Sequence, residues 1–413
     1  MTPTADSQPP NKSMLIVTVD RLPAWILPAW GSTWVATPIL DELAASGVVF
    51  DRVLTPTPSP HSTVRDLLGE GQESLLERSV RDGLSVSIIS DQPSIVETIK
   101  PPDQADVTLV EPACPDQRPV DESSTGVAKV CEVASKIIAS DRPDVVWVNL
   151  GSLGVCWDAP KKVMDIYVDP EDPPPPEGCS VPNRRVESSE DPDLIVTLRH
   201  VFAAQVSLID RCLGGLIQEF RLQQDGAEAT LLVAGLRGIP LGLHGWIGGT
   251  GHESEDQLPF SETMHVPVLL VDSKKRMAGQ RYSGLTIPAD IGLTMRELGG
   301  WQAQPLASQQ AKSLKGLFVD WQASSRDRVI IRSASGDAVS TTAWHYIKPH
   351  QGNSQTQHLL YSKPDDFFEQ SDVTDRCKTV AEEFCAVLGH EEGTSALSAW
   401  TLPLTAATQK APV

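Results

Sequence analysis

The residues best suited to do chemistry lie at the ends of two short apolar runs. Asp20 and Arg21 directly follow the run Met14–Val19. Arg237 follows a second run, Ala229–Ala234, by three positions. A carboxylate there can hold a divalent cation, and a guanidinium fork binds sulfate or phosphate. Because calcium normally takes about 6–8 oxygen ligands, one carboxylate makes a poor calcium site. Asp20 is therefore interpreted equally well as a metal ligand or as an ion-pair partner of Arg21 or Arg237.

Hydroxyl, imidazole and guanidinium groups gather in residues 59–65, which read Ser-Pro-His-Ser-Thr-Val-Arg. Ser59 and Ser62 are candidate nucleophiles, and His61 is a candidate acid or base. Arg65 is a candidate anion-binding residue. The same pattern is typical of a polar turn that leads into a helix, and we favour that interpretation.

The motifs of other common reactions do not occur in the sequence. It contains no Gly-x-Ser-x-Gly, no His-Glu-x-x-His and no Gly-x-x-x-x-Gly-Lys. The glycine-rich segment Gly248–Gly251 lacks a lysine, so it predicts a loop. His244, next to Gly245, is a further candidate anion-binding residue, although a single histidine near glycines is typical of a structural or surface position.

The elements that must position these residues alternate along the chain. Apolar and β-branched runs predict strands at Met14–Val19, Ser85–Ile89, Val145–Leu150, Ala229–Ala234 and Val266–Val271. Apolar residues at helical spacing predict helices at Pro38–Ser46, Leu75–Asp82, Val127–Ala139 and Leu194–Leu222. This alternation predicts an α/β fold with a mostly parallel central sheet and helices on both faces. Ligand sites in such sheets lie at the carboxyl ends of the strands, where Asp20 stands.

We expect an α/β domain over residues 13–300 and a small C-terminal antiparallel α+β subdomain over residues 309–400. Predicted strands and one helix of the subdomain lie at Arg328–Arg332, Trp344–Ile347, His358–Tyr361 and Val380–Leu388. Residues 169–193 are acidic and proline-rich, so we expect an exposed excursion. Residues 1–12 and 401–413 are expected to be disordered.

Composition excludes several classes of partner. The net charge is −20, from 54 acidic and 34 basic residues, so nucleic acid and anionic membranes are repelled. No window reaches the roughly 18 apolar residues of a membrane span, and the N-terminus lacks the features of a secretory signal. We therefore expect a cytoplasmic protein. The seven cysteines are scattered, without the close spacing of a zinc site, and are expected to be free thiols.

Several segments together point to a known family. Residues 34–51 read Trp-Val-Ala-Thr-Pro-Ile-Leu-Asp-Glu-Leu-Ala-Ala-Ser-Gly-Val-Val-Phe-Asp. They stand in order with Val17–Leu22, Thr55–Pro58, Trp147–Leu150, Ile209–Asp210, Val233–Gly238, Leu241–Gly245 and Val266–Val268. In content and spacing these segments resemble a sulfatase of the alkaline phosphatase superfamily, most closely before residue 70. The resemblance implies the fold that the strand and helix pattern predicts.

The resemblance also implies a reaction. In a sulfatase, aspartates hold a divalent cation, usually calcium, and a cysteine or serine oxidised to formylglycine attacks sulfur. Asp20 falls on a metal-ligand position, but Leu236 and Arg237 stand where the family has an aspartate and then a histidine or asparagine. Pro60 falls on the nucleophile and Val64 on its arginine. Asp20 is thus the only ligand position that survives.

Two hypotheses of different class follow. The first is a pseudoenzyme with an anion-binding or assembly role, in which Arg21, Arg65 and Arg237 converge on a sulfate- or phosphate-type anion or a sulfated small molecule. It needs no cofactor, and its protein partner is unknown. The alternative is a divergent sulfuric- or phosphate-ester hydrolase that uses calcium, Asp20 and a nearby serine or threonine.

Overall fold

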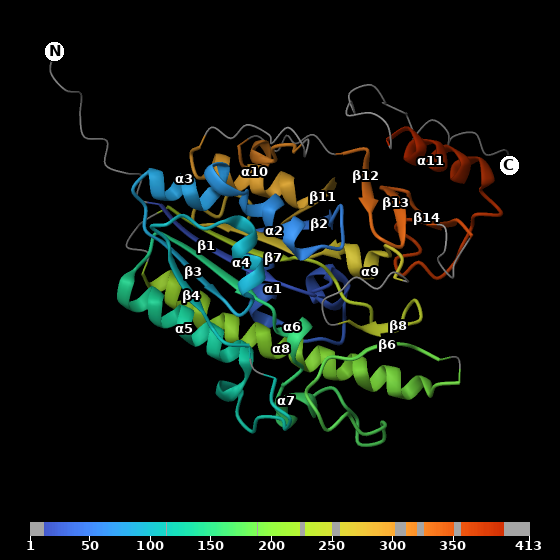
Figure 1. Cartoon of the computed structure of the whole chain (residues 1–413), viewed down its shortest axis with the longest axis horizontal. Coiled ribbons are helices and arrows are strands. Elements are labelled where there is room, and N and C mark those ends of the chain that lie inside the picture. Colours follow the sequence, from blue (N-terminus) through green and yellow to red (C-terminus); the bar gives the residue numbers. More distant parts are fainter. Residues whose placement is uncertain are drawn as a thin grey trace, which may run out of the picture.

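The computed structural model describes residues 12–112, 114–187, 189–223, 228–249, 257–301, 311–319, 326–350 and 357–391. Within these residues a nine-stranded sheet forms the centre of the molecule (Figure 1). Its order is β11-β2-β10-β7-β1-β5-β3-β4, with β9 paired to β2. The strands are β1 (Lys12–Val19), β2 (Val48–Leu54), β3 (Val86–Ser90), β4 (Asp106–Leu109), β5 (Val145–Leu150), β7 (Glu228–Gly235), β9 (His265–Val266), β10 (Val268–Asp272) and β11 (Gln280–Thr286).

The sheet is mostly parallel, as the sequence predicts. β1 pairs in parallel with β5 and β7, β3 with β4 and β5, and β11 with β2. β10 runs antiparallel to both of its neighbours, β7 and β2. The consequence for the site is that β1, β7, β5 and β3 end at the same edge of the sheet.

Helices cover both faces of the sheet (Figure 1). One face packs against α1 (Pro38–Ser46), α5 (Gly126–Asp141) and α8 (Pro192–Leu222), and the other against α2 (Pro60–Leu68), α3 (Leu75–Arg81), α4 (Pro93–Ile99) and α10 (Pro288–Leu298). β1 serves both cores, because Leu15 and Val17 point to the first and Met14 and Ile16 to the second. The α/β fold class is therefore confirmed.

Helix α8 is long and apolar enough to cross a membrane by length and composition, the one such helix within the described residues. Of its most apolar window, 61% is buried inside the protein. Phe202, Leu208 and Leu216 of this helix belong to the core against the sheet. The apolar character of α8 is thus accounted for by packing in a globular core.

A second sheet of four antiparallel strands lies within the described C-terminal residues (Figure 1). Its order is β12 (Arg328–Arg332), β13 (Gly336–Thr341), β14 (Trp344–Pro349) and β15 (Leu359–Ser362). Val339, Tyr346 and Leu360 form a small core with Phe384 and Leu388 of α11 (Lys378–Glu391). The antiparallel C-terminal module is thus confirmed. The expected disorder of residues 1–11 and 401–413 falls outside the described residues, while Lys12 begins β1.

The acidic segment 169–193 is mostly exposed, but it is not a simple excursion. It contains β6 (Asn183–Arg185), which pairs with β8 (Trp246–Gly248), and it ends in the first turn of α8. Short helices complete the chain: α6 (Ser152–Val155), α7 (Lys161–Met164), α9 (Ser261–Met264), and single 3-10 turns at Ala24–Ile26, Pro28–Trp30, Gly71–Glu73, Glu122–Ser124 and Lys315–Phe318.

Candidate anion-binding site

Asp20 and Arg237 meet because β1 and β7 are parallel neighbours that end together. Val19 pairs with Gly235, and the backbone N–H of Leu236 donates to the carbonyl of Val19 at 2.9 Å. The Arg237 guanidinium donates to both carboxylate oxygens of Asp20, from Nε to Oδ1 at 2.9 Å and from Nη2 to Oδ2 at 3.1 Å. The Asp20 carboxylate is 2% exposed. Arg237 therefore forms a bidentate, nearly buried ion pair that engages both oxygens of Asp20.

Arg21 lies beside this pair in an unusual backbone conformation. Its φ of 62° is in the left-handed region, which residues other than glycine seldom adopt. The residue is 5% exposed, and its Nε lies 3.9 Å from Oδ2 of Asp20. Glycines make room for the side chain: a Cβ on Gly154 would lie 2.7 Å from Cδ of Arg21, and one on Gly249 would lie 3.2 Å from Nη1. The side chain thus lies close to two glycines, and the surrounding structure must offset the cost of its strained backbone.

The electrostatics of the site keep Asp20 ionised and Arg21 protonated. Burial raises the pKa of Asp20, but the charges of Arg237 and Arg21 outweigh burial and leave the pKa below its usual value. Burial, together with the neighbouring Arg237 charge, lowers the pKa of Arg21 to about 10, so it remains protonated at neutral pH. Two charged guanidiniums therefore lie beside one ionised carboxylate at the pocket.

Asp91 is a fourth charged residue at this edge that the sequence analysis did not single out. It directly follows β3, and its Oδ1 accepts the Gly151 N–H at 2.7 Å. Burial raises the pKa of Asp91 to about 6 despite this hydrogen bond. Its position after a buried strand, like that of Asp20, is the sequence signal that could have identified it.

A pocket with about 40 Å³ of volume open to water molecules lies against the two arginines. Its lining includes Arg21, Arg237, Pro58 and Gly249. Because about 10–15 Å³ of such volume holds one water molecule, the pocket has room for a few waters or one tetrahedral oxyanion. It borders a larger cavity of about 480 Å³, with which it shares three lining residues, Pro240, Gln257 and Thr263.

Arg65 does not join this pocket, so the hypothesis that three arginines converge is wrong for this residue. Its side chain is 45% exposed, with Nη1 3.8 Å from Oε2 of Glu70. Nη2 contacts Oγ of Ser62 on the same helix at 3.5 Å. The turn of α2 on which Arg65 lies directs its guanidinium to a surface ion pair, so only Arg21 and Arg237 converge.

The candidate nucleophiles form the start of α2. Pro58 borders the pocket, where its carbonyl accepts from Nη1 of Arg237 at 3.5 Å, and Ser59 follows directly. The Ser59 hydroxyl accepts a hydrogen bond from the Ser62 backbone N–H at 3.4 Å, so it caps the helix. Nδ1 of His61 lies 2.6 Å from Oγ1 of Thr98. The interpretation of this segment as a turn that leads into a helix is confirmed.

His244 belongs to a separate polar network. Its Nδ1 lies 2.8 Å from Oε1 of Glu262, its Nε2 lies 3.2 Å from the Glu369 carbonyl, and its ring stacks on Phe260 at 3.6 Å. Burial opposes protonation, but Glu262 and Glu369 raise the pKa of His244. His244 lines the larger cavity rather than the pocket between the arginines.

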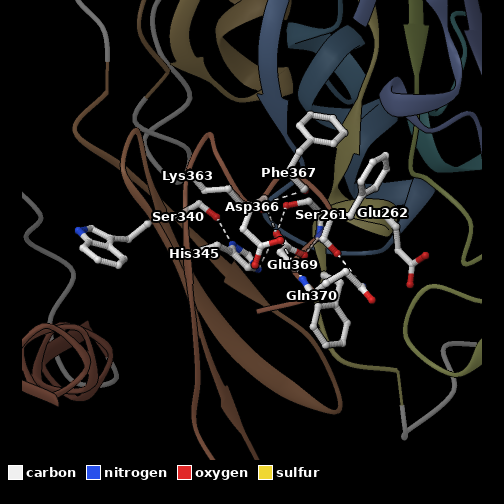
Figure 2. A network of polar contacts seen from close by, with 12 residues as sticks. Ser261, Glu262, Ser340, His345, Lys363, Asp366, Phe367, Glu369 and Gln370 are labelled. Atoms are coloured by element: carbon white, nitrogen blue, oxygen red, sulfur yellow. Dashed lines mark hydrogen bonds and ion pairs between the residues drawn. The ribbon is translucent and has the colours of Figure 1, made fainter. Parts of the chain in front are cut away.

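Glu369 is the centre of that network (Figure 2). Its carboxylate accepts from the Ser261 backbone N–H at 2.8 Å and pairs with Lys363 Nζ at 2.8 Å, while His345 lies 3.8 Å away. Burial raises the pKa of Glu369, but the positive groups around it lower the pKa below its usual value. These contacts join the C-terminal module to α9 of the α/β domain, which is a structural role for the network.

The side chains at the sheet edge do not fit the calcium ion that the resemblance implies. Leu236 has no donor atom, and Arg237 engages both oxygens of Asp20. Among the described residues, no three histidine, cysteine, aspartate or glutamate side chains are arranged to hold a metal ion. The guanidinium of Arg237 therefore supplies the positive charge that Asp20 faces.

Comparisons with known proteins rest on structure, since no family model and no curated protein matches the sequence. The chain is similar to the phosphonate monoester hydrolase of Agrobacterium radiobacter, with a TM-score of 0.71 and 16% identity over 93% of this chain and 96% of that chain. A protein solved with its substrate D-glucosamine-2-N,6-O-disulfate has a TM-score of 0.70 and 12% identity, covering 92% of this chain and 97% of that one. A 2-O GAG sulfatase has a TM-score of 0.68 and 15% identity, covering 93% and 92%. The chain thus has the fold of these sulfatase and phosphonate monoester hydrolase structures.

Proposed function

We propose that the protein is a pseudoenzyme of the sulfatase fold that binds a sulfate- or phosphate-type oxyanion between Arg21 and Arg237, without a metal ion and without hydrolysing its ligand. The observation that carries this proposal is the buried guanidinium of Arg21, which lines the pocket beside the Asp20–Arg237 pair. Guanidinium groups are suited to this task because their planar donor forks match the oxygens of sulfate and phosphate.

Charge balance supports a bound anion. The guanidiniums of Arg21 and Arg237 line the pocket, and the carboxylate that contacts them, that of Asp20, is already shared with Arg237 through two hydrogen bonds. A singly charged oxyanion, such as a sulfate ester, would pair with the guanidinium of Arg21. Hydrogen bonds to charged groups contribute about 1.5–3 kcal/mol each, so a few such bonds support binding in the micromolar to millimolar range.

The same geometry speaks against the alternative, a divergent hydrolase that uses Asp20. Hydrolysis would need a nucleophile near the anion and a cation or acid to stabilise the developing charge. The Ser59 hydroxyl serves as a helix cap, and Asp20 is bound to Arg237. Neither residue is poised for a chemical step, so the proposal is binding without turnover.

A sulfated small molecule is the ligand class that fits the surroundings. The larger cavity next to the pocket is lined by Trp246, Phe260 and Tyr361, whose flat faces could contact the body of such a molecule. One structural neighbour was solved with a disulfated glucosamine as its substrate. The uncharged part of such a ligand would contact the aromatic lining of the larger cavity, whereas its anionic group would be recognised by the charge of the arginines.

Titration calorimetry with sodium sulfate and sodium phosphate at low ionic strength tests the binding. The wild-type protein and Arg65→Met should bind sulfate alike, because Arg65 lies outside the pocket, whereas Arg21→Met should lose at least tenfold in affinity. Equal affinities in all three proteins would contradict the proposal.

A turnover assay tests the second half of the proposal. Aryl sulfates and aryl phosphates are incubated with the protein and calcium, manganese or zinc, alongside Asp20→Ala. We expect no turnover above the blank in either protein. Cation-dependent turnover that disappears in the Asp20→Ala protein would establish the hydrolase instead.

A further inference from the structure

A serine and a histidine on neighbouring strands of the C-terminal sheet form a hydrogen-bonded pair that takes no part in the anion site. Ser340 of β13 lies directly opposite His345 of β14 in the antiparallel register. Oγ of Ser340 lies 2.5 Å from Nδ1 of His345. Figure 2 shows this pair beside the Glu369 carboxylate. The fold thus places a hydroxyl against a ring nitrogen, the contact by which a general base activates a nucleophile.

The other ring nitrogen of His345 determines the direction of this hydrogen bond. Nε2 lies 3.0 Å from the Pro259 carbonyl, which can only accept a hydrogen bond. In the neutral ring Nε2 therefore carries the hydrogen, and Nδ1 has a free lone pair. Burial lowers the pKa of His345, so the ring is neutral at neutral pH. The Ser340 hydroxyl thus donates to Nδ1, as a nucleophile donates to its base.

A buried carboxylate lies close enough to stabilise the positive charge that this ring gains with a proton. Oε1 of Glu369 lies 3.8 Å from Nε2 of His345, and both side chains are 1% exposed. Burial raises the pKa of Glu369, but the positive groups around it leave the pKa below its usual value, so the carboxylate is ionised at neutral pH. Serine, histidine and carboxylate therefore follow one another, as they do in serine hydrolases.

The pair borders a pocket that is separate from the anion site. The pocket has about 70 Å³ of volume open to water molecules, and Ser340 and His345 both line it. Among the described residues it shares no lining residue with the pocket between the two arginines. Much of its wall is apolar, formed by Leu54, Leu285, Trp344, Pro364 and Phe367. Because about 10–15 Å³ of such volume holds one water molecule, the pocket has room for a short acyl group.

Arg52 lines the same pocket and can stabilise the oxyanion that ester hydrolysis forms. Its guanidinium makes one hydrogen bond within the described residues, from Nη1 to the Thr342 carbonyl at 3.1 Å. A guanidinium has five N–H donors, so others are available for a substrate oxygen. The Lys363 ammonium, in contrast, is engaged by Glu369 and two backbone carbonyls. Arg52 is therefore the cation that the pocket offers to a developing negative charge.

We propose that Ser340 and His345 form a catalytic dyad that hydrolyses short-chain carboxylic esters in this pocket. In the first step the Ser340 oxygen bonds to the ester carbonyl carbon while its proton moves to Nδ1 of His345. The carbonyl oxygen becomes an oxyanion, which Arg52 stabilises. The bond to the alcohol oxygen then breaks, the alcohol leaves with the proton from His345, and the acyl group stays on Ser340.

Water completes the reaction at the same two residues. A water molecule gives one proton to His345, and its oxygen bonds to the acyl carbon. The bond between that carbon and the Ser340 oxygen breaks, and Ser340 recovers a proton from His345. A carboxylic acid leaves the pocket. One ester and one water become one alcohol and one acid, so the atoms balance with water as the only co-reactant.

A fluorophosphonate probe tests the dyad in the full chain, because this probe phosphonylates serines that a base activates. The modified serine is located by mass spectrometry of peptides from the labelled protein. We expect the adduct on Ser340, labelling at least about tenfold slower in His345→Gln, and no adduct in Ser340→Ala. Ser362→Ala, on β15 of the same sheet, is the matched control and should be labelled like the wild type. A wild-type protein without an adduct on Ser340, or one labelled on Ser261 instead, would overturn the proposal.

An ester hydrolysis assay tests turnover and chain length. The wild type, Ser340→Ala and Ser362→Ala are incubated with para-nitrophenyl acetate and para-nitrophenyl palmitate, and thermal unfolding verifies that each variant is folded. We expect acetate hydrolysis above the blank in the wild type and Ser362→Ala, at least about tenfold less in Ser340→Ala, and little palmitate hydrolysis. Equal acetate hydrolysis in the wild type and Ser340→Ala would overturn the proposal. Neither assay depends on the anion pocket, and the labelling site in the wild type does not depend on any variant.

Discussion

Removal of the Arg237 guanidinium should strongly destabilise the protein, because Asp20 would be left buried without its main partner. The two hydrogen bonds of 2.9 and 3.1 Å place the opposite charges about 4 Å apart. At an effective dielectric constant of about 20 this separation corresponds to roughly 4 kcal/mol. Loss of one partner from a buried pair typically costs about 3–5 kcal/mol. We therefore expect Arg237→Met to lower the free energy of unfolding by about 3–5 kcal/mol at pH 7.

The stability that Arg237→Met loses should decrease as the pH falls. In the wild type the pKa of Asp20 in the folded state is below its unfolded value, so its ion pair stabilises the fold above that unfolded value and is lost as the pH falls. Without Arg237, burial becomes the dominant influence and raises the folded-state pKa above the unfolded value. The deficit of Arg237→Met should then be greatest near pH 7–8 and shrink toward about pH 4–5, where the buried carboxyl binds a proton.

A double-mutant cycle isolates this interaction. Urea denaturation followed by tryptophan fluorescence is measured for the wild type, Arg237→Met, Asp20→Asn and the double variant. We expect a coupling energy of about 3 kcal/mol, because an uncharged replacement of a buried pair is often close to neutral. Arg221 and Glu42, an exposed pair 2.8 Å apart, provide the control, with an expected coupling below about 1 kcal/mol. Additive effects at Asp20 and Arg237, or a deficit that does not change with pH, would refute the reasoning.

Three further outcomes are expected. His244→Gln should cost more stability near pH 6 than near pH 9 in urea denaturation. The raised folded-state pKa of His244 stabilises the fold below about pH 6.5, and this contribution is lost as the pH rises through the folded-state pKa. An equal cost at both pH values would count against this role of His244. Asp91→Asn should raise the free energy of unfolding at pH 8 by on the order of 3 kcal/mol and have no benefit below about pH 4. Burial raises the pKa of Asp91 from 3.8 to about 6, and one pKa unit is worth about 1.4 kcal/mol. Gly154→Ala should weaken sulfate binding in calorimetry, because the new Cβ would lie 2.7 Å from the Arg21 side chain. Gly215→Ala is the control and should leave binding intact, because its Cβ meets nothing within 4 Å. Unchanged binding in both variants would show that the placement of Arg21 is unimportant.

Local sequence determined most of the secondary structure. The helix expected at Pro38–Ser46 has these bounds in the structure, because proline suits the first turn and Gly47 ends the apolar pattern. The strand expected at Val145–Leu150 also has these bounds, since a short apolar and β-branched run favours a strand buried on both faces. The lack of a ligand atom at Leu236 was likewise visible, because a leucine side chain has no donor atom in any conformation.

The tertiary structure decided which of these residues meet. Arg21 and Arg65 were equal candidates in sequence, but Arg21 is buried against two glycines, whereas Arg65 lies on the part of α2 that faces solvent. Cys156 and Cys179 appeared scattered until the chain returned in an adjacent extended segment. Composition and periodicity report the conformation of neighbouring residues. Contacts between distant segments depend instead on sheet order and helix orientation, which the packing of the whole core determines.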